Sequence, residues 1–149
     1  MKKKRLFTLM VLASLLIFSN FATGQDKDKG GRPLSTTLTG AAEVPGPGDT
    51  DGGGTAQITL NQGQNQVCFE LTVSNIATAT AAHIHEAPTG QAGPPVVTLT
   101  PPPAEGSSKN CVSADAELIK RIRQNPANFY VNVHNAEFPN GAVRGQLSK

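Results

Sequence analysis

The chain of 149 residues has no tryptophan, one tyrosine, two cysteines and two methionines, and each scarcity excludes something. Both methionines, Met1 and Met10, lie at the extreme N-terminus. The cysteines lack the Cys-x-x-Cys spacing of redox-active or metal-binding thiol pairs. Because both methionines lie in a stretch expected to be a signal peptide and both cysteines are expected to pair with each other, a blue-copper electron-transfer site, which needs a thiolate and usually a weak thioether ligand, is excluded. With so few aromatic residues, the core must consist mainly of Val, Ile, Leu and Ala.

The chain also lacks the sequence motifs of several classes of enzyme. The chain has no nucleophile elbow, no phosphate-binding glycine loop before a helix, and no pair of carboxylates in an evident cleft. The formal net charge is +2, but Lys2 to Arg5 supply four of the 13 cations, and without them the charge is slightly negative. No basic patch with interleaved aromatics is present, so we expect no nucleic-acid partner.

The N-terminus has the pattern of a secretory signal peptide. A basic stretch ends at Arg5, an apolar run extends from Leu6 to Phe21, and small residues follow at Ala22-Thr23-Gly24. We predict a signal peptide at 1–24, a disordered lead-in at 25–33 and one domain at 34–149, with no membrane span after cleavage. The protein would then be secreted or periplasmic. A retained N-terminal anchor is the alternative, disfavoured by the small residues at the exit.

Both cysteines, Cys68 and Cys111, lie in the part expected to be exported. An even number of cysteines in an oxidising compartment favours one disulfide. In the loop-entropy model, a loop of this length contributes roughly 4 kcal/mol to stability.

Short segments of alternating apolar and polar residues, separated by turns, predict an all-β domain. In the clearest strand, Val67, Phe69, Leu71 and Val73 share one face, which places Cys68 on the other. Further strands are expected at 34–41, 55–60, 80–86, 96–100, 110–112, 129–135 and 143–148. Asn140-Gly141 is a two-residue hairpin signal. The pattern indicates an antiparallel Greek-key sandwich or flattened barrel.

One short helix is expected at 114–124. Ser113 or Asp115 can cap its N-terminus. Leu118, Ile119 and Ile122 form one apolar stripe, which predicts that the helix covers an open side of the sheets.

All three histidines fall in two strand-like segments, 82–86 and 131–135. If Ile84 and Val133 point into the core, then His83, His85 and His134 point away from it. Two histidines two positions apart on a strand, joined by a third from a neighbouring strand, can form a three-nitrogen site of the kind copper and zinc prefer. Glu86, Asn132 and Asn135 are near enough in sequence to orient the rings. The competing interpretation is three surface histidines that only hydrogen-bond to loops.

The chain resembles the CHRD domain first described in chordin, over about residues 36 to 148. The matching segments, in order along the chain, are Leu38-Thr39-Gly40, Glu43-Val44-Pro45, Ala82-His83-Ile84-His85, Gly90 with Gly93, Tyr130 to His134, and Gly141 to Leu147. The resemblance implies a β-rich fold and an extracytoplasmic location, and it implies no particular reaction. Arg144 and Glu43 both belong to the pattern, so they can form a structural ion pair.

The chain is also distantly similar to Cu,Zn superoxide dismutase. His83, His85, His134 and Arg144 repeat the order of that enzyme's copper ligands and anion-guiding arginine. The chain has no further histidine for the bridging ligand or the zinc site.

Three functions follow as hypotheses. The first is a metal-binding module for copper, or less readily zinc, and the second is a copper-only dismutase-like redox enzyme. The third is a metal-independent module that binds an envelope or matrix protein through the histidine-bearing face and the long loops, 45–54 and 87–95. An enzyme is the less favoured interpretation.

Overall fold

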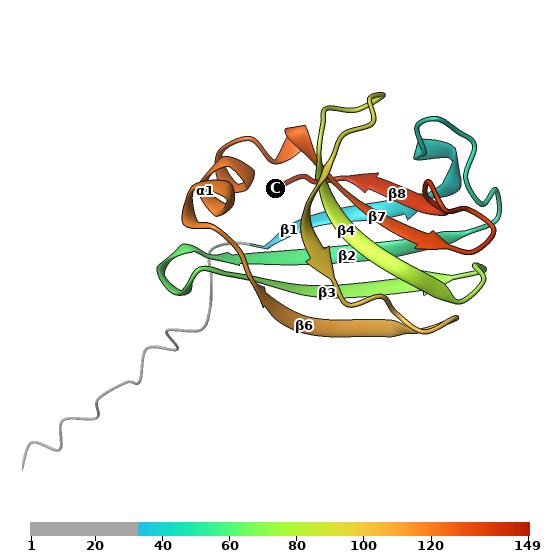
Figure 1. Ribbon diagram of the computed structural model, residues 1–149, viewed down its shortest axis with the longest axis horizontal. Helices are drawn as coiled ribbons and strands as arrows, with labels where there is room; N and C mark the ends of the chain where they lie inside the picture. Colours follow the sequence, from blue (N-terminus) through green and yellow to red (C-terminus); the bar gives the residue numbers. More distant parts are fainter. Residues whose placement is uncertain (1–32) are drawn as a thin grey trace, which may run out of the picture.

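The structure is a computed structural model that describes residues 33–149, so the predicted signal peptide and almost all of the lead-in lie outside it. Eight strands and one α-helix make up the domain (Figure 1). Their bounds are β1 Leu34–Thr39, β2 Gly53–Asn61, β3 Gln66–Ser74, β4 Ala79–Glu86, β5 Pro95–Leu99, β6 Ser107–Ser113, α1 Ala116–Gln124, β7 Phe129–Asn135 and β8 Val143–Gln146. Three short 3₁₀ turns, η1 Gly40–Ala42, η2 Gln62–Gln64 and η3 Pro126–Asn128, join some of them.

All eight strands belong to one sheet, in the order β5-β4-β7-β8-β1-β2-β3-β6, and every pairing is antiparallel. The sheet curls into a nearly closed barrel (Figure 1). The seam lies between the two edge strands, where Ser108 donates a 2.7 Å hydrogen bond to the carbonyl of Thr100. After β6 the chain returns through α1 to place β7 beside β4, which is a Greek-key connection. The predicted all-β antiparallel fold is confirmed, in its flattened-barrel form.

The core fills the barrel and is built mainly from aliphatic side chains. The alternation predicted for β3 is confirmed, because Val67, Phe69, Leu71 and Val73 are all buried. The strand β7 is buried along its whole length: Phe129, Val131 and Val133 face the core, and the residues between them face the opposite side of the sheet.

The helix α1 covers one end of the barrel, as predicted (Figure 1). Leu118, Ile119 and Ile122 are its buried residues, and they join the core cluster. Asp115 is the N-cap, and its carboxylate accepts hydrogen bonds from the backbone N–H groups of Glu117 and Leu118. The helix therefore begins at Ala116 and not at Ala114.

Three local predictions need correction. The first strand ends at Thr39, because the chain turns into η1 at Gly40. Strand β6 is longer than predicted, because pairing with β3 holds its polar residues in the sheet despite their lack of apolar alternation. The hairpin from β7 to β8 is not a two-residue turn at Asn140-Gly141, since residues 136–142 form the connection.

Of the residues described, none belongs to a helix long and apolar enough to cross a membrane.

Candidate metal centre

The three histidines lie on one face of two neighbouring strands. Strands β4 and β7 pair so that His83 is opposite Asn132 and Ala81 is opposite His134. Because side chains alternate along a strand, this register places His83, His85 and His134 on the same side of the sheet. Ile84 and Val133, fully buried, occupy the core side. The prediction that the three histidines share the face of β4 and β7 that points away from the core is confirmed.

The imidazole rings converge. The ring centroids are 5.4 Å apart for His83 and His85, 5.1 Å for His83 and His134, and 5.7 Å for His85 and His134. One nitrogen from each ring lies within 4.8 Å of the other two, so the cluster can hold a metal ion. Two ligands of one ion at about 2.0 Å in tetrahedral geometry are roughly 3.3 Å apart. The Nδ1 of His83 and the Nε2 of His134 are 3.2 Å apart, close to that separation.

Two of the three rings are buried although they point away from the core. His85 and His134 are 7% and 9% exposed, while His83 is half-buried. The connecting loops after β4 and β7 fold back over this face and cover the rings through Gly93 and Pro139. The cluster is therefore recessed under loops, with His83 as its most accessible member.

Backbone carbonyls fix the orientation of both buried rings. The Nδ1 of His85 lies 2.8 Å from the carbonyl oxygen of Gly93, and the Nδ1 of His134 lies 3.1 Å from that of Pro139. A carbonyl only accepts, so in each ring Nδ1 carries the proton and Nε2 offers its lone pair to the cluster. The Nε2 of His85 is buried and has no hydrogen-bond partner among residues 33–149. These two backbone carbonyls orient the rings, a role that was predicted for the side chains of Glu86, Asn132 and Asn135.

Burial also favours the uncharged form of the three imidazoles. Desolvation lowers the pKa of His83, His85 and His134 below the ordinary value of 6.5. The proximity of the rings to one another lowers the pKa of His85 and His134 further. All three imidazoles are therefore neutral at neutral pH, which is the form that binds a metal.

Tyr130 is the main contributor that the sequence analysis missed. Its ring stacks on His85, with centroids 4.9 Å apart and planes inclined by 15°. Its hydroxyl accepts a 3.1 Å hydrogen bond from the backbone N–H of Gly93 and lies 3.3 Å from the Gly93 carbonyl oxygen that His85 also contacts. As the one tyrosine, two and four positions before Asn132 and His134, it shares their face of β7, and that parity is the signal that could have revealed it.

A buried polar group lies beside the histidines. The amide of Asn132 donates a 3.3 Å hydrogen bond to the carboxylate of Glu43. Burial raises the pKa of Glu43 to about 7, although the nearby Arg144 charge and the Asn132 hydrogen bond act in the opposite direction. Asn132 thus supports Glu43 and makes no hydrogen bond to a histidine ring within the described residues, so no direct contact supports its predicted role in orienting the rings.

Arg144 lies on the same face. Its guanidinium stacks on Tyr130, with the central carbon 3.4 Å from the ring centroid. One nitrogen, Nη2, donates to the Pro88 carbonyl and to the side chain of Gln146. The other, Nη1, is buried without a partner within the described chain. Arg144 influences Glu43 electrostatically, and its hydrogen bonds go elsewhere.

The other two predicted supporting residues point away from the cluster. The Glu86 carboxylate pairs with Arg121 of α1 at 3.0 Å. The side chain of Asn135 is on the core side of β7 and accepts hydrogen bonds from the backbone N–H groups of Glu137 and Phe138, which shapes the following turn.

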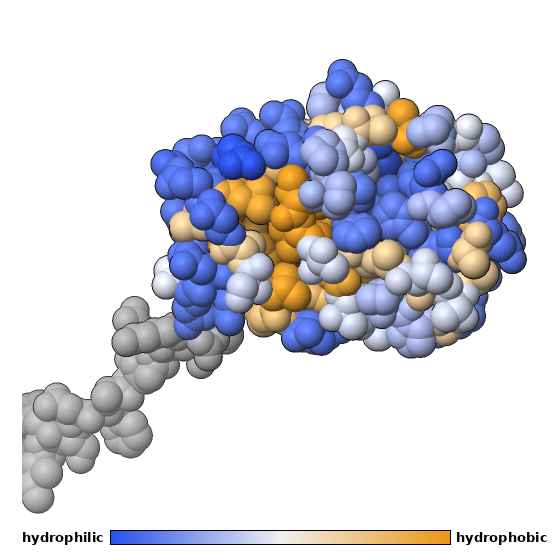
Figure 2. Space-filling view, in the orientation of Figure 1, coloured by the Kyte–Doolittle hydropathy of each residue, from blue (hydrophilic) through white to orange (hydrophobic). Residues whose placement is uncertain are grey.

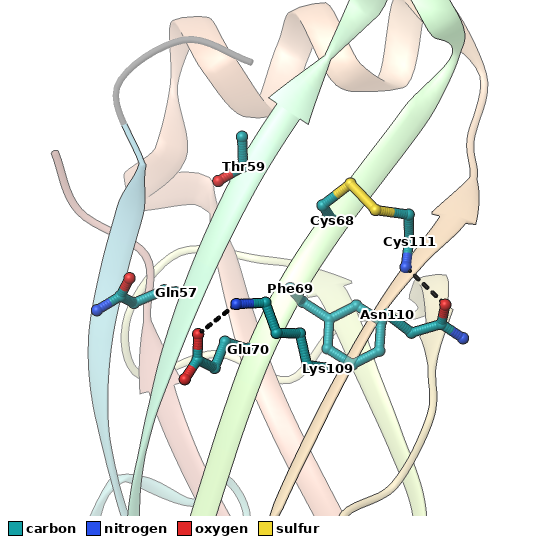
Figure 3. Close-up of a pocket in the computed structure, with 8 residues that line it drawn as sticks. All are labelled: Gln57, Thr59, Cys68, Phe69, Glu70, Lys109, Asn110 and Cys111. Carbon is teal, nitrogen blue, oxygen red and sulfur yellow. Dashed lines mark hydrogen bonds and ion pairs between the residues drawn. A yellow bond between two sulfur atoms is a disulfide. The ribbon is translucent and has the colours of Figure 1, made fainter. Parts of the chain in front are cut away.

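The predicted disulfide is present between Cys68 and Cys111, which are opposite each other on β3 and β6. It lines a pocket on the outer face of β2, β3 and β6 (Figure 3). No histidine lines this pocket, so it is distinct from the histidine cluster.

These observations define an all-β barrel with a recessed three-imidazole cluster on its outer face. The model of the CHRD domain family matches residues 34–147, and the chain belongs to that family. No curated protein and no solved structure matches the chain. The family match points to no ligand, so the case for a metal centre depends on the geometry of the cluster.

Proposed function

We propose that this protein is an exported module that binds one transition-metal ion, copper in preference to zinc, through His83, His85 and His134. The observation that carries the proposal is the convergence of three neutral imidazoles, two of which are held by backbone carbonyls with Nε2 facing the cluster. Hydrogen bonds of this kind to the second ring nitrogen are usual for metal-bound histidines.

The chemistry of the donors favours copper or zinc. The cluster contains only imidazole nitrogens, whereas calcium and magnesium prefer oxygen ligands. Among divalent first-row metals, copper binds a given nitrogen site more tightly than zinc. The donor nitrogens lie within 4.8 Å of one another, so the widest pair would have to approach by up to about 1.5 Å to reach the roughly 3.3 Å between tetrahedral ligands of one ion. The half-buried His83 provides the path of entry.

Export is supported by two independent features. The N-terminal pattern is that of a signal peptide, and the Cys68–Cys111 disulfide is of a kind that persists in oxidising compartments. The metal would then be taken up outside the cytoplasm.

Calorimetric titration of the purified protein with Cu²⁺ and with Zn²⁺ tests the proposal. We expect one ion bound per chain, with the tighter binding for Cu²⁺. The variant His85→Ala/His134→Ala should lose this binding. Glu86→Gln is the matched control, because Glu86 follows His85 on β4 but pairs with Arg121 at the surface. Equal affinity of the double variant and the unaltered protein would refute the proposal.

A redox enzyme is the second candidate function, favoured by Arg144. Its buried Nη1 has no partner in residues 33–149, and its guanidinium lies on the ring that stacks on His85. A positive group so placed can attract a small anion toward the cluster. Superoxide dismutation by the copper-loaded protein, above the rate of the same amount of free copper, would support this function. A rate equal to that of free copper would dismiss it.

A further inference from the structure

The disulfide lies on the outer face of the barrel, in ordered rows of side chains. The register of β2, β3 and β6 places Thr59, Cys68 and Cys111 in one row. Gln57, Glu70 and Lys109 form the adjacent row. Cys68 is half-buried and Cys111 is exposed, so neither sulfur belongs to the core.

The two rows border a pocket that leads to the sulfur atoms. Figure 3 shows the disulfide bridging β3 and β6, with the Glu70–Lys109 ion pair beside it. The ion pair is 3.2 Å long and solvent-exposed, so its side chains can move aside at little cost. Thiol reagents can therefore reach this disulfide in the folded protein.

The direction of approach follows from the sheet order. A thiolate attacks a disulfide in line with the S–S bond, from the side opposite the sulfur that leaves. Since β6 is the last strand of the sheet, no other strand of residues 33–149 pairs with it beyond Cys111. The side-chain contacts with Thr100 across the seam are made by Ser108 and Asn110, which alternation places on the opposite face of β6 from Cys111. The open side is thus next to Cys111.

We propose that Cys68–Cys111 is a site of thiol–disulfide exchange, opened in the folded protein by an external dithiol that attacks the sulfur of Cys111. The first thiolate forms a mixed disulfide with Cys111, and Cys68 leaves as a thiolate that takes up a proton. The second thiol of the reductant, as its thiolate, then displaces Cys111. The dithiol is oxidised to its own disulfide and the protein gains two thiols, so two electrons are transferred in all.

The backbone pairing of β3 and β6 does not depend on the disulfide. Their ladder extends from Gln66 opposite Ser113 to Thr72 opposite Ser107. We therefore expect the reduced protein to keep its fold and its metal centre, since no histidine lies near these strands' pocket. The exchange would make the cross-link reversible.

The rate of reduction by dithiothreitol, measured by alkylation and mass spectrometry, tests the proposal. In native buffer the rate should rise linearly with reductant and stay within about tenfold of the rate in concentrated guanidinium chloride. Circular dichroism should remain unchanged. A rate that reaches a plateau at the unfolding rate of the protein would overturn the proposal, because reduction would then require unfolding.

Two further measurements test which sulfur is attacked and whether the charge of Lys109 affects the rate. Under limiting glutathione, the mixed disulfide should be found on Cys111 by peptide mapping, and an adduct on Cys68 would overturn the assigned direction. Lys109→Gln should slow reduction by glutathione about two- to fivefold and reduction by dithiothreitol less, because the attacking glutathione thiolate carries two net negative charges and the attacking dithiothreitol thiolate carries one. Equal slowing with both reagents would show that Lys109 acts through structure and would contradict the electrostatic role.

Discussion

The ring of Tyr130 lies between the imidazole of His85 and the guanidinium of Arg144. It is stacked on the first with centroids 4.9 Å apart, and the central carbon of the second is 3.4 Å from its centroid. Its hydroxyl also bonds to the backbone of Gly93, whose carbonyl oxygen accepts from His85. One side chain thus links a candidate ligand, its carbonyl acceptor and the nearest buried cation.

Tyr130→Phe should weaken metal binding. The ring stack is kept, but the loop at Gly93 loses two hydrogen bonds and holds His85 less firmly. Loss of an orienting contact to a metal ligand costs about tenfold in affinity at the lower end of its usual range. Calorimetric titration with Cu²⁺ checks this, with Glu86→Gln as the control. An unchanged affinity would show that the Gly93 carbonyl is positioned without the hydroxyl.

Metal binding should tolerate mild acid. Protons compete with the metal for imidazole, but burial holds the pKa of His83, His85 and His134 below 6.5. The affinity should therefore begin to fall at a lower pH than the affinity of a three-histidine peptide whose imidazoles have ordinary pKa values. Titrations of both with Cu²⁺ across a pH series test this. A decline at the same pH for the protein and the peptide would contradict it.

The same shifts predict the acid stability of the metal-free protein. Below 6.5 the unfolded chain binds protons before the folded one, because the pKa of each histidine is lower in the folded state. The free energy of unfolding should thus decrease as the pH is lowered from 6.5 through the pKa values of the folded state. Denaturant unfolding at several pH values measures it.

Glu43 should act in the opposite sense. Its pKa rises from 4.5 to about 7 on folding, so between these values the folded protein holds a proton that the unfolded chain has lost. Stability from this group is complete below pH 4.5 and is lost as the pH rises toward 7, by up to about 3 kcal/mol. Glu43→Gln mimics the protonated form and should remove this loss.

The comparison of both proteins by urea unfolding isolates Glu43 from the histidines. The difference in unfolding free energy should grow in favour of Glu43→Gln between pH 4.5 and 7. A difference that does not vary with pH would mean that the pKa of Glu43 is ordinary.

Removal of the disulfide should lower stability without loss of the fold. The bridge closes a loop between residues 43 positions apart, and in the loop-entropy model its loss costs about 4 kcal/mol. Cys68→Ser/Cys111→Ser should therefore unfold at a lower urea concentration and bind Cu²⁺ with unchanged affinity. Loss of metal binding in the folded variant would show that the two sites are coupled.

Much of the fold was predictable from alternation alone. The periodicity of residues 67–73 and 129–135 predicted the buried faces of β3 and β7. Of the two possible caps of α1, Ser113 and Asp115, the structure uses Asp115, so the helix starts two residues later than predicted. The bounds of β6 were not predictable, because Ser107 to Asn110 are polar and are held in the sheet by the register with β3. The hairpin length after β7 was missed because the side chain of Asn135 stabilises a wider turn than Asn140-Gly141 indicates.

The histidines of the candidate site were predictable, and most of their supports were not. Parity within β4 and β7 is a local property, so it placed His83, His85 and His134 on one face. The carbonyls of Gly93 and Pro139 come from loops, and backbone groups carry no sequence signal of their own. Glu86 was misleading because a strand-end residue can turn to a helix such as α1.

The two-sided packing of β7 has a consequence for studies of this protein. One strand supplies the barrel interior with Val131 and Val133 and the opposite face with Tyr130 and His134. A slip of one residue would exchange these two sets and disperse the imidazoles. An unfolded chain has its first and third histidines some fifty positions apart and gains no such cluster. Copper uptake would then serve as an assay for correct strand registration, and a library screened for retained metal would be screened for correctly assembled barrels as well.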